Sequence, residues 1–173
     1  MATEEQTAYD AAIGLYSTGP TRGGQRLTIP NRRVTKLSFP LCKVVGSPIG
    51  DVTFTIRKVS DDSLIASKVW GDASALPTYP EVSWEEVAFD TPVTVNEEVK
   101  LLVEYDGGDI DNYIFYYISP SDVKANEHFI FYLGGSYDET YADYDGAYIY
   151  TYTTLAPAVG SSMAAKMMAA GVL

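Results

Sequence analysis

The chain has 173 residues, which is enough for one domain with a sizeable buried core. Its 12 basic and 23 acidic residues give a formal net charge of −11, which repels polyanions and argues against nucleic acid as a partner. Aromatic residues make up 13% of the chain, with 14 tyrosines, and this composition favours β-strands over helices.

The N-terminal region gives few signals of export. The first residues, MATEEQTAYDAA, contain two glutamates and no apolar run, so no secretory signal peptide is expected. No stretch approaches the roughly 18 apolar residues that a membrane helix needs, so no membrane span is expected either. Residues 1–10 form an N-terminal segment in which Thr3 to Gln6 either cap a short helix or lead into a strand that begins in AAIGLYS.

Apolar residues recur at mostly every second position from Arg26 to Thr153, which is the pattern of half-buried strands. A phase slip between Val34 and Leu37 indicates a β-bulge. Cys42, the single cysteine, lies in the apolar stretch FPLCKVV and is expected to be a buried free thiol. The segments with this alternation are 34–41, 51–59, 63–70, 81–89, 99–105, 112–119, 128–133 and 147–153.

Turn signals separate these segments, namely GSPIGD (46–51), SDDS (60–63), EYDGGDIDN (104–112) and SPSD (119–122). No long segment with helical period lies between the strands, which excludes a parallel βαβ fold. The sequence therefore predicts an all-β domain over residues 11–155, an antiparallel two-sheet β-sandwich of jelly-roll type. A cluster of cations is expected to form a solvated edge rather than a nucleic-acid surface: Arg22, Arg26, Arg32, Arg33 and Lys36.

The C-terminal tail, residues 156–173, contains SSMAAKMMAAGVL, whose capping serines and methionine spacing predict a short helix. So short a helix is marginal by itself in water and needs a surface to lie on. That surface is either the chain's own sandwich or a neighbouring subunit. In the second case Met163, Met167 and Met168 are the assembly contact.

Catalytic patterns are scarce. A Ser–His–acid or Cys–His arrangement needs a histidine, and His128 in NEHFIFYL is the single one in the chain. It is expected to be structural, and the same shortage argues against a His/Cys metal site. Adjacent Glu85 and Glu86 point to opposite faces of a strand, so they do not form a hydrolytic pair. We expect no enzymatic activity.

Two acidic loops are candidates for calcium, because carboxylate oxygens are the ligands that this ion prefers. Asp138, Asp143 and Asp145 lie within eight residues and are followed by Gly146, which permits a tight turn. A second loop carries Asp106, Asp109 and Asp111. Neither loop has the spacing of the twelve-residue calcium loop, so the alternative is that both are simple acidic turns. No other cofactor is expected.

The stretch YDETYADYDGAYIYTYT (137–153) divides into two parts. In the second part alternate tyrosines, from Tyr148 to Tyr152, share one face of a strand and predict an aromatic ladder. In the first part Tyr137, Tyr141 and Tyr144 lack alternation and are expected to be exposed. Exposed tyrosines offer rigid contact area for a sugar ring or a protein partner, so these three are the candidate ligand-binding residues.

Two stretches resemble a recurrent β-sandwich module, KLSFPLCKVVGSPIGDVTFTIRKVSDDSLIAS at 36–67 and VSWEEVAFDTPVTVNEEVKLLVEY at 82–105. The module occurs in tail and particle proteins of phages and archaeal viruses and in some bacterial surface proteins. Its features here are the Gly-x-Pro-x-Gly-Asp turn from Gly46 to Asp51, the Trp84-to-Phe89 segment, the Pro92-Val93 turn and a Leu-Leu-Val strand. The resemblance covers roughly residues 11–153 and concerns folding rather than chemistry.

The resemblance implies a structural or attachment component of a viral particle, such as a capsid decoration, spike or tail-fibre subunit located in the virion. Its expected partners are other copies of itself in a homo-oligomer and other particle proteins. The alternative is a carbohydrate-binding module, at a cell surface, that uses the loop tyrosines and either Trp70 or Trp84 to bind a glycan.

Overall fold

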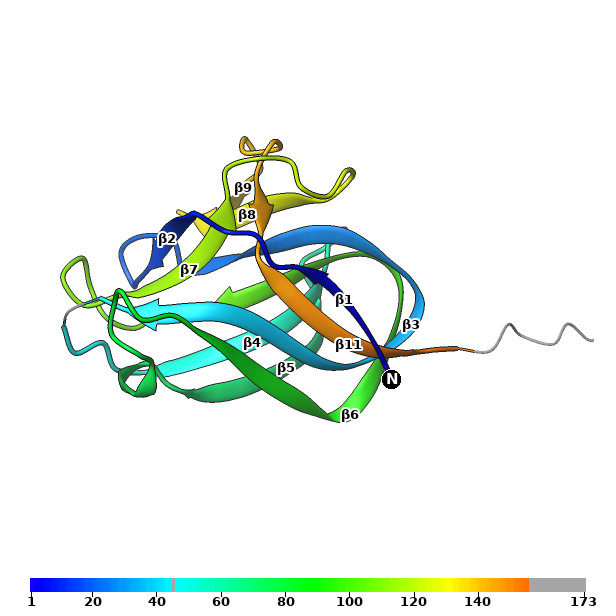
Figure 1. The fold of residues 1–173 in the computed structure, drawn as a ribbon, viewed down its shortest axis with the longest axis horizontal. Helices are drawn as coiled ribbons and strands as arrows, with labels where there is room; N and C mark the ends of the chain where they lie inside the picture. The colour runs from blue at the N-terminus through cyan, green and yellow to red at the C-terminus, as the bar shows by residue number, and fades with distance from the viewer. Residues whose placement is uncertain (45, 156–173) are drawn as a thin grey trace, which may run out of the picture.

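The computed structural model describes residues 1–44 and 46–155, and its ordered elements are almost entirely β-strands (Figure 1). The strands are β1 (Ala2–Gln6), β2 (Ala11–Leu15), β3 (Arg22–Lys43), β4 (Asp51–Lys58), β5 (Leu64–Asp72), β6 (Ser83–Glu104), β7 (Ile114–Ser119), β8 (His128–Leu133), β9 (Ser136–Asp138), β10 (Asp145–Gly146) and β11 (Tyr148–Thr154). A 3-10 turn, η1 (Ala73–Ala75), follows β5. All pairings between these strands are antiparallel, which confirms the predicted all-β antiparallel fold.

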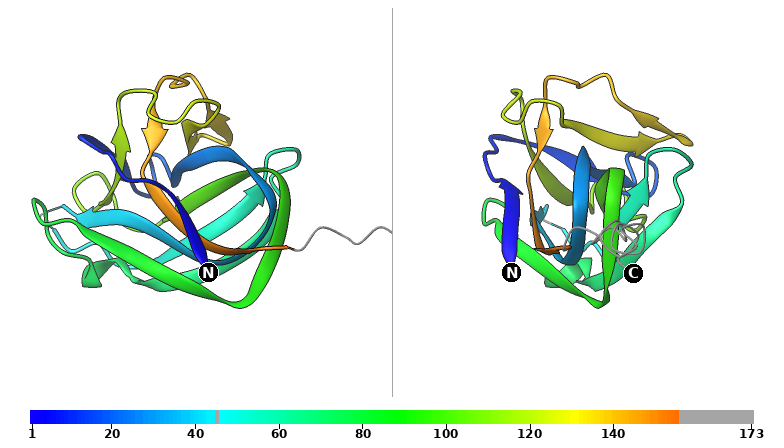
Figure 2. Two further views of the ribbon diagram at one scale, coloured as in Figure 1. Left: turned by 45° about the vertical axis from the view of Figure 1, so that its right-hand side comes forward. Right: turned by 90° about the vertical axis from the view of Figure 1, so that its right-hand side faces the viewer.

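Two strands of 22 residues, β3 and β6, hold the fold together. They pair along their whole length, from Arg22 opposite Glu104 to Leu41 opposite Ser83. The partner on the other side of β3 changes along the strand: β8 first, then β11, then β7. Hydrogen bonding thus joins the strands of the described residues into one 11-stranded sheet that curves around its interior, rather than the two separate sheets expected from sequence (Figure 2).

A corner in this long hairpin explains why one strand serves two parts of the fold. The β3–β6 register shifts between Ile29 and Arg32. Asn31 takes a left-handed conformation there, with φ of 47°, which asparagine tolerates better than most residues. Its backbone N–H donates to Oδ1 of Asn96 at 2.9 Å, so the turn in β3 is fixed to the turn in β6.

The core follows the alternation that the sequence predicted. On β4, Val52, Phe54 and Ile56 are fully buried. The Phe54 ring packs edge-on against Phe39 of β3 with 4.9 Å between centroids. Cys42 is a buried free thiol, as expected.

The bulge predicted between Val34 and Leu37 is confirmed by a register shift between Val34 and Lys36 in the β3–β6 pairing. The aromatic ladder on β11 is confirmed as well. Tyr148 and Tyr150 are 0% and 1% exposed, and their rings stack with 6.1 Å between centroids. Tyr152 continues the row at 5.6 Å from Tyr150.

The sequence predicted a separate N-terminal segment and a C-terminal helix, and the structure describes the first of these two regions. Residues 2–6 are strand β1 on the edge of the sheet beside β11, so the helical alternative for Thr3 to Gln6 is wrong and the N-terminal segment belongs to the sheet. The predicted C-terminal helix of residues 156–173, with Met163, Met167 and Met168, lies outside the described residues. Within residues 1–44 and 46–155, no helix is long and apolar enough to cross a membrane.

The predicted solvated edge of cations is also corrected, because β3 is a central strand with neighbours on both sides. Four of the five cations reach acids on other segments. The ion pairs are Arg22 with Asp62 and Glu104, Arg26 with Glu98 and Glu139, Arg32 with Glu4, and Lys36 with Glu86. These cations therefore link strands instead of forming a free basic surface.

Candidate functional site

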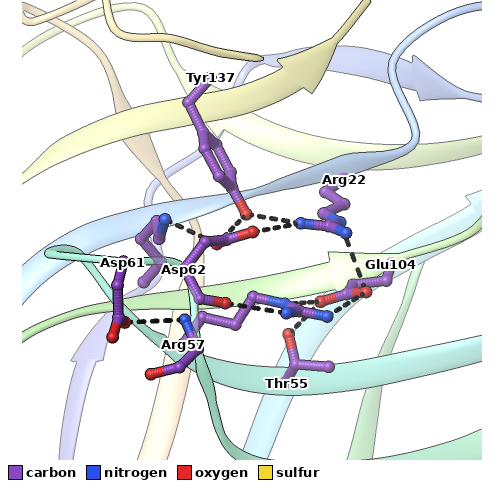
Figure 3. A network of polar contacts seen from close by, with 9 residues as sticks. Arg22, Thr55, Arg57, Asp61, Asp62, Glu104 and Tyr137 are labelled. Atoms are coloured by element: carbon purple, nitrogen blue, oxygen red, sulfur yellow. Dashed lines mark hydrogen bonds and ion pairs between the residues drawn. The ribbon is translucent and has the colours of Figure 1, made fainter. Parts of the chain in front are cut away.

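A polar cluster lies on the outer face of the sheet, across β3, β6 and β4 (Figure 3). The strand register brings three of these residues side by side, because Arg22 on β3 and Thr53 on β4 both lie opposite Glu104 on β6. The alternation that buries Val52, Phe54 and Ile56 turns the residues between them, Thr53, Thr55 and Arg57, outward.

Glu104 is the acceptor at the centre of this row. Arg57 donates to it twice, from Nε at 2.6 Å and from Nη2 at 3.2 Å. The hydroxyl of Thr55 donates at 2.6 Å, and Nε of Arg22 lies 3.5 Å away. The bidentate pair with Arg57 fixes the orientation of both side chains and joins β4 to β6.

Asp62 is the second acceptor, at the end of the turn between β4 and β5, and it adopts a left-handed φ of 59°. It receives Nζ of Lys100 at 2.7 Å, Nη1 of Arg22 at 2.9 Å and the hydroxyl of Tyr137 at 2.9 Å. The Lys100 side chain is only 5% exposed. Burial alone would raise the pKa of Asp62, but the hydrogen bonds from Lys100 and Tyr137 outweigh it and lower the pKa.

Tyr137, on β9, completes the cluster. Its hydroxyl donates to Asp62 and accepts from Nη1 of Arg22 at 3.1 Å, while Nζ of Lys100 lies 3.9 Å from the centre of its ring. Burial and the hydrogen bond to Asp62 raise its pKa far above the ordinary value. Tyr137 is therefore half-buried and engaged, so the prediction that its side chain is exposed is wrong, while its role in ligand binding stays a prediction.

A groove of about 350 Å³ opens beside the cluster. It is lined by hydroxyl groups of Thr53, Thr55 and Ser67 and by the charged groups of Arg22, Arg57 and Glu104. These charged groups pair with one another, as described above. The cluster thus acts as a brace that ties β3, β4, β6 and β9 together.

The other two candidate tyrosines border a different, apolar pocket of about 250 Å³. Tyr141 is 42% exposed, whereas Tyr144 is half-buried against the core, so exposure is confirmed for Tyr141 alone. Their rings lie 5.2 Å apart, and Tyr141 also lies 5.9 Å from Phe131. The remaining lining is Ala12, Ile13, Pro20, Ile118 and Phe129. Apart from the phenol groups, no side chain there provides a hydrogen bond, which suits an apolar partner group.

The carboxylates proposed for calcium are used in three different ways. Asp145 is fully buried and accepts hydrogen bonds from Gln25 at 2.5 Å and from the backbone N–H groups of Val123 and Lys124 at 2.7 Å each. Asp138 accepts from the backbone and hydroxyl of Thr140, while Asp143 is exposed. In the part of the chain that the structure describes, no three metal-ligating side chains form a group.

The other side chains considered from the sequence, His128, Trp70 and Trp84, all contact neighbouring residues of the fold. His128 is half-buried at the start of β8, with Nε2 at 3.9 Å from Glu139. Trp70 packs against the core, whereas Trp84 lies beside Tyr9 with 6.3 Å between ring centroids.

No local sequence pattern marked Arg57, Asp62 or Lys100 as site residues. The outward position of Arg57 follows from the alternation on β4, and Asp62 lies in a recognised turn. The contacts of Asp62 and Lys100 with Tyr137, which is 75 positions after Asp62, depend on how the sheet curves, and no local pattern encodes that.

Comparisons with known proteins do not identify a family for this chain. Neither the protein-family models nor the curated proteins compared with this chain give a match. One solved structure, of infectious bursal disease virus Gx strain, aligns with a TM-score of 0.29 and 10% identity over 96% of this chain. The aligned region covers 44% of the viral chain, so this protein spans less than half of that chain's length. A TM-score this low does not establish a shared fold or a shared role.

Proposed function

We propose that this protein is a non-catalytic structural or attachment component of a viral particle, such as a capsid decoration, spike or fibre subunit. The observation that supports the proposal is the brace of Glu104 and Asp62. It unites four strands with paired charges on the outer face of a curved sheet. Such bracing suits a scaffold that holds loops in place for contact with other molecules. The motifs at 36–67 and 82–105 resemble a module of viral particles and support the same role.

In this role the protein acts by shape, through contacts with copies of itself and with other particle proteins. The apolar pocket at Tyr141 and Tyr144 is one surface suited to a protein partner, because aromatic side chains give rigid contact area. The C-terminal methionines are a second proposed contact. Location in the virion follows from this proposal, and location at a cell surface follows from the alternative below.

The test is the state of association of the full chain in solution, measured by size-exclusion chromatography with light scattering. We expect a closed oligomer, and we expect deletion of residues 157–173 to give a folded monomer. The combined change of Met163, Met167 and Met168 to serine should do the same, whereas Lys166→Ala in the same segment should not. A monomeric full chain, or unchanged assembly after the deletion, would contradict the proposal.

The alternative is a carbohydrate-binding module that uses the loop tyrosines, and the exposure of Tyr141 favours it. A glycan array would detect binding. Loss of that binding in Tyr141→Ala, with folding intact by circular dichroism, would favour the alternative over a purely structural role.

A further inference from the structure

A shallow hollow of about 580 Å³ lies apart from both the brace and the apolar pocket. It is lined by Thr7, Tyr9 and Asp10 from the connection between β1 and β2, and by Ser121 from the segment after β7. Trp84, at the start of β6, also lines it. Three segments that are far apart in the sequence therefore meet here.

The lining combines two kinds of group that the apolar pocket does not combine. Trp84 and Tyr9 provide aromatic surface, while Thr7, Asp10 and Ser121 provide hydroxyl and carboxylate oxygens. A sugar ring has an apolar face of C–H groups and a rim of hydroxyl groups, so it needs both kinds of contact. The volume is within the range of small-molecule sites, which is about 300–1,000 Å³.

The hollow is held in shape by contacts within the fold. The Tyr9 ring lies between Trp84, 6.3 Å away, and Tyr117, 5.1 Å away. The side chain of buried Gln6 donates to the carbonyl of Ala8 at 3.0 Å and accepts from the Ala8 N–H at 2.6 Å. A preformed site loses less entropy on binding, which favours even a ligand that makes few contacts.

Charge narrows the class of ligand. Among the described residues that line the hollow, Asp10 alone carries a charge, and the chain as a whole has a net charge of −11. Acidic sugars such as sialic acid would be repelled by this field. Neutral sugars would not.

We propose that the hollow formed by Tyr9, Asp10, Trp84 and Ser121 binds a neutral saccharide. The inference deepens the attachment role proposed above, on which it rests, by naming a ligand class and a site. It also places glycan binding at Trp84, away from the loop of Tyr137, Tyr141 and Tyr144.

Tryptophan fluorescence provides the test, because Trp84 is one of two tryptophans and Trp70→Phe leaves it as the sole reporter. The probes are maltotriose, cellotriose, mannotriose and lacto-N-tetraose, each titrated into the Trp70→Phe chain up to about 20 mM, the range of weak binding. We expect a saturable change in emission with at least one probe. We expect 3′-sialyllactose, which is anionic, to bind more weakly than neutral lactose.

Two sets of variants check the location. Asp10→Ala combined with Ser121→Ala changes exposed residues, so folding should be retained while the Kd rises about tenfold or more through loss of hydrogen bonds. Tyr141→Ala is the matched control and should keep wild-type affinity. The absence of a saturable change with all four probes would overturn the inference, as would binding that survives the double variant and is lost in Tyr141→Ala.

Failure of this inference differs from failure of the proposed function. Light scattering on the same samples reports assembly independently of sugar. An assembled chain that binds none of the probes would refute the saccharide site alone. A chain that binds a probe but stays monomeric would refute the assembly role.

Discussion

At the scale of single residues, two acids show how the same side chain gains different roles from its surroundings. Asp62 accepts from Lys100, Arg22 and Tyr137, which come from three different strands. Asp145, in contrast, is fully buried and accepts from two backbone N–H groups and one amide side chain. Each acid thereby joins a loop to the sheet, since Asp62 lies in the turn between β4 and β5, and Asp145 on β10 holds the segment of Val123 and Lys124.

Asp62→Asn should lower the free energy of unfolding at pH 7 by about 1–3 kcal/mol, because nearly buried Lys100 loses its charged partner. The pKa of Asp62 is lowered by folding, so its stabilising effect is complete above the ordinary pKa of aspartate. The effect is lost as the pH falls through the lowered pKa, below about pH 4. As the pH falls through that range, the free energy of unfolding should therefore decrease less for Asp62→Asn than for the wild type.

Urea unfolding from pH 2 to pH 7 would measure this difference. Asp122→Asn is the control, since it removes one carboxylate from an exposed position and should leave the pH profile of the wild type unchanged. Parallel profiles for Asp62→Asn and the wild type would show that Asp62 does not contribute in this way.

At the scale of elements, β11 shows how an alternating sequence becomes a packed strand. Tyr148, Tyr150 and Tyr152 form one row, and β11 lies between β1 and β3. The guanidinium of Arg32 on β3 lies 4.0 Å from the centre of the Tyr152 ring and donates to the hydroxyl of Tyr150. The ladder thus has an apolar body and a polar end that is paired with a cation.

Tyr150→Ala should destabilise the protein by about 3–5 kcal/mol, because it removes a large side chain that is 1% exposed. Tyr150→Phe keeps the ring and loses the hydrogen bond with Arg32, so it should cost only about 1 kcal/mol. Thr153→Ala, at the exposed end of β11, should have almost no effect. Chemical denaturation would rank the three variants, and equal losses for Ala and Phe would refute the packing role of the ring.

At the scale of the whole molecule, every other strand of the described fold is connected to β3 or β6, either directly or through one intervening strand. Strands β4, β7, β8 and β11 pair directly with one of the two, and β1, β2, β5, β9 and β10 pair with those four. No group of these strands can separate without breaking the pairing to a shared strand. The described residues should therefore unfold as one cooperative unit.

Denaturation followed by tryptophan fluorescence and by far-ultraviolet circular dichroism tests this cooperativity. Trp70 lies on β5 and Trp84 at the start of β6, so fluorescence reports on β5 and β6 while dichroism reports on all strands. We expect the two transitions to coincide. Separate midpoints would show that part of the sheet unfolds independently of β3 and β6.

Short-range order was predictable from the sequence. The alternation from Arg26 to Thr153 indicated the strands, the phase slip after Val34 indicated the bulge, and the spacing of Tyr148, Tyr150 and Tyr152 indicated the ladder. The continuity of β3 and β6 was missed, because the predicted segments start only at Val34 on β3 and leave a gap between Phe89 and Val99 on β6. Pro92-Val93, expected to form a turn, lies inside β6. The exposure of Tyr137 and Tyr144 was overestimated for a related reason, since local sequence does not show what covers a loop.

The sequence by itself determined which side chains face the interior of each strand, because that choice depends on a period of two residues and on hydrophobicity. Tertiary structure alone decided which side chains meet, such as Asp62 with Tyr137 or Tyr9 with Trp84. Those contacts join segments about 75 positions apart and depend on register, strand curvature and burial acting together. A one-dimensional pattern carries the first kind of information, and only the folded chain carries the second.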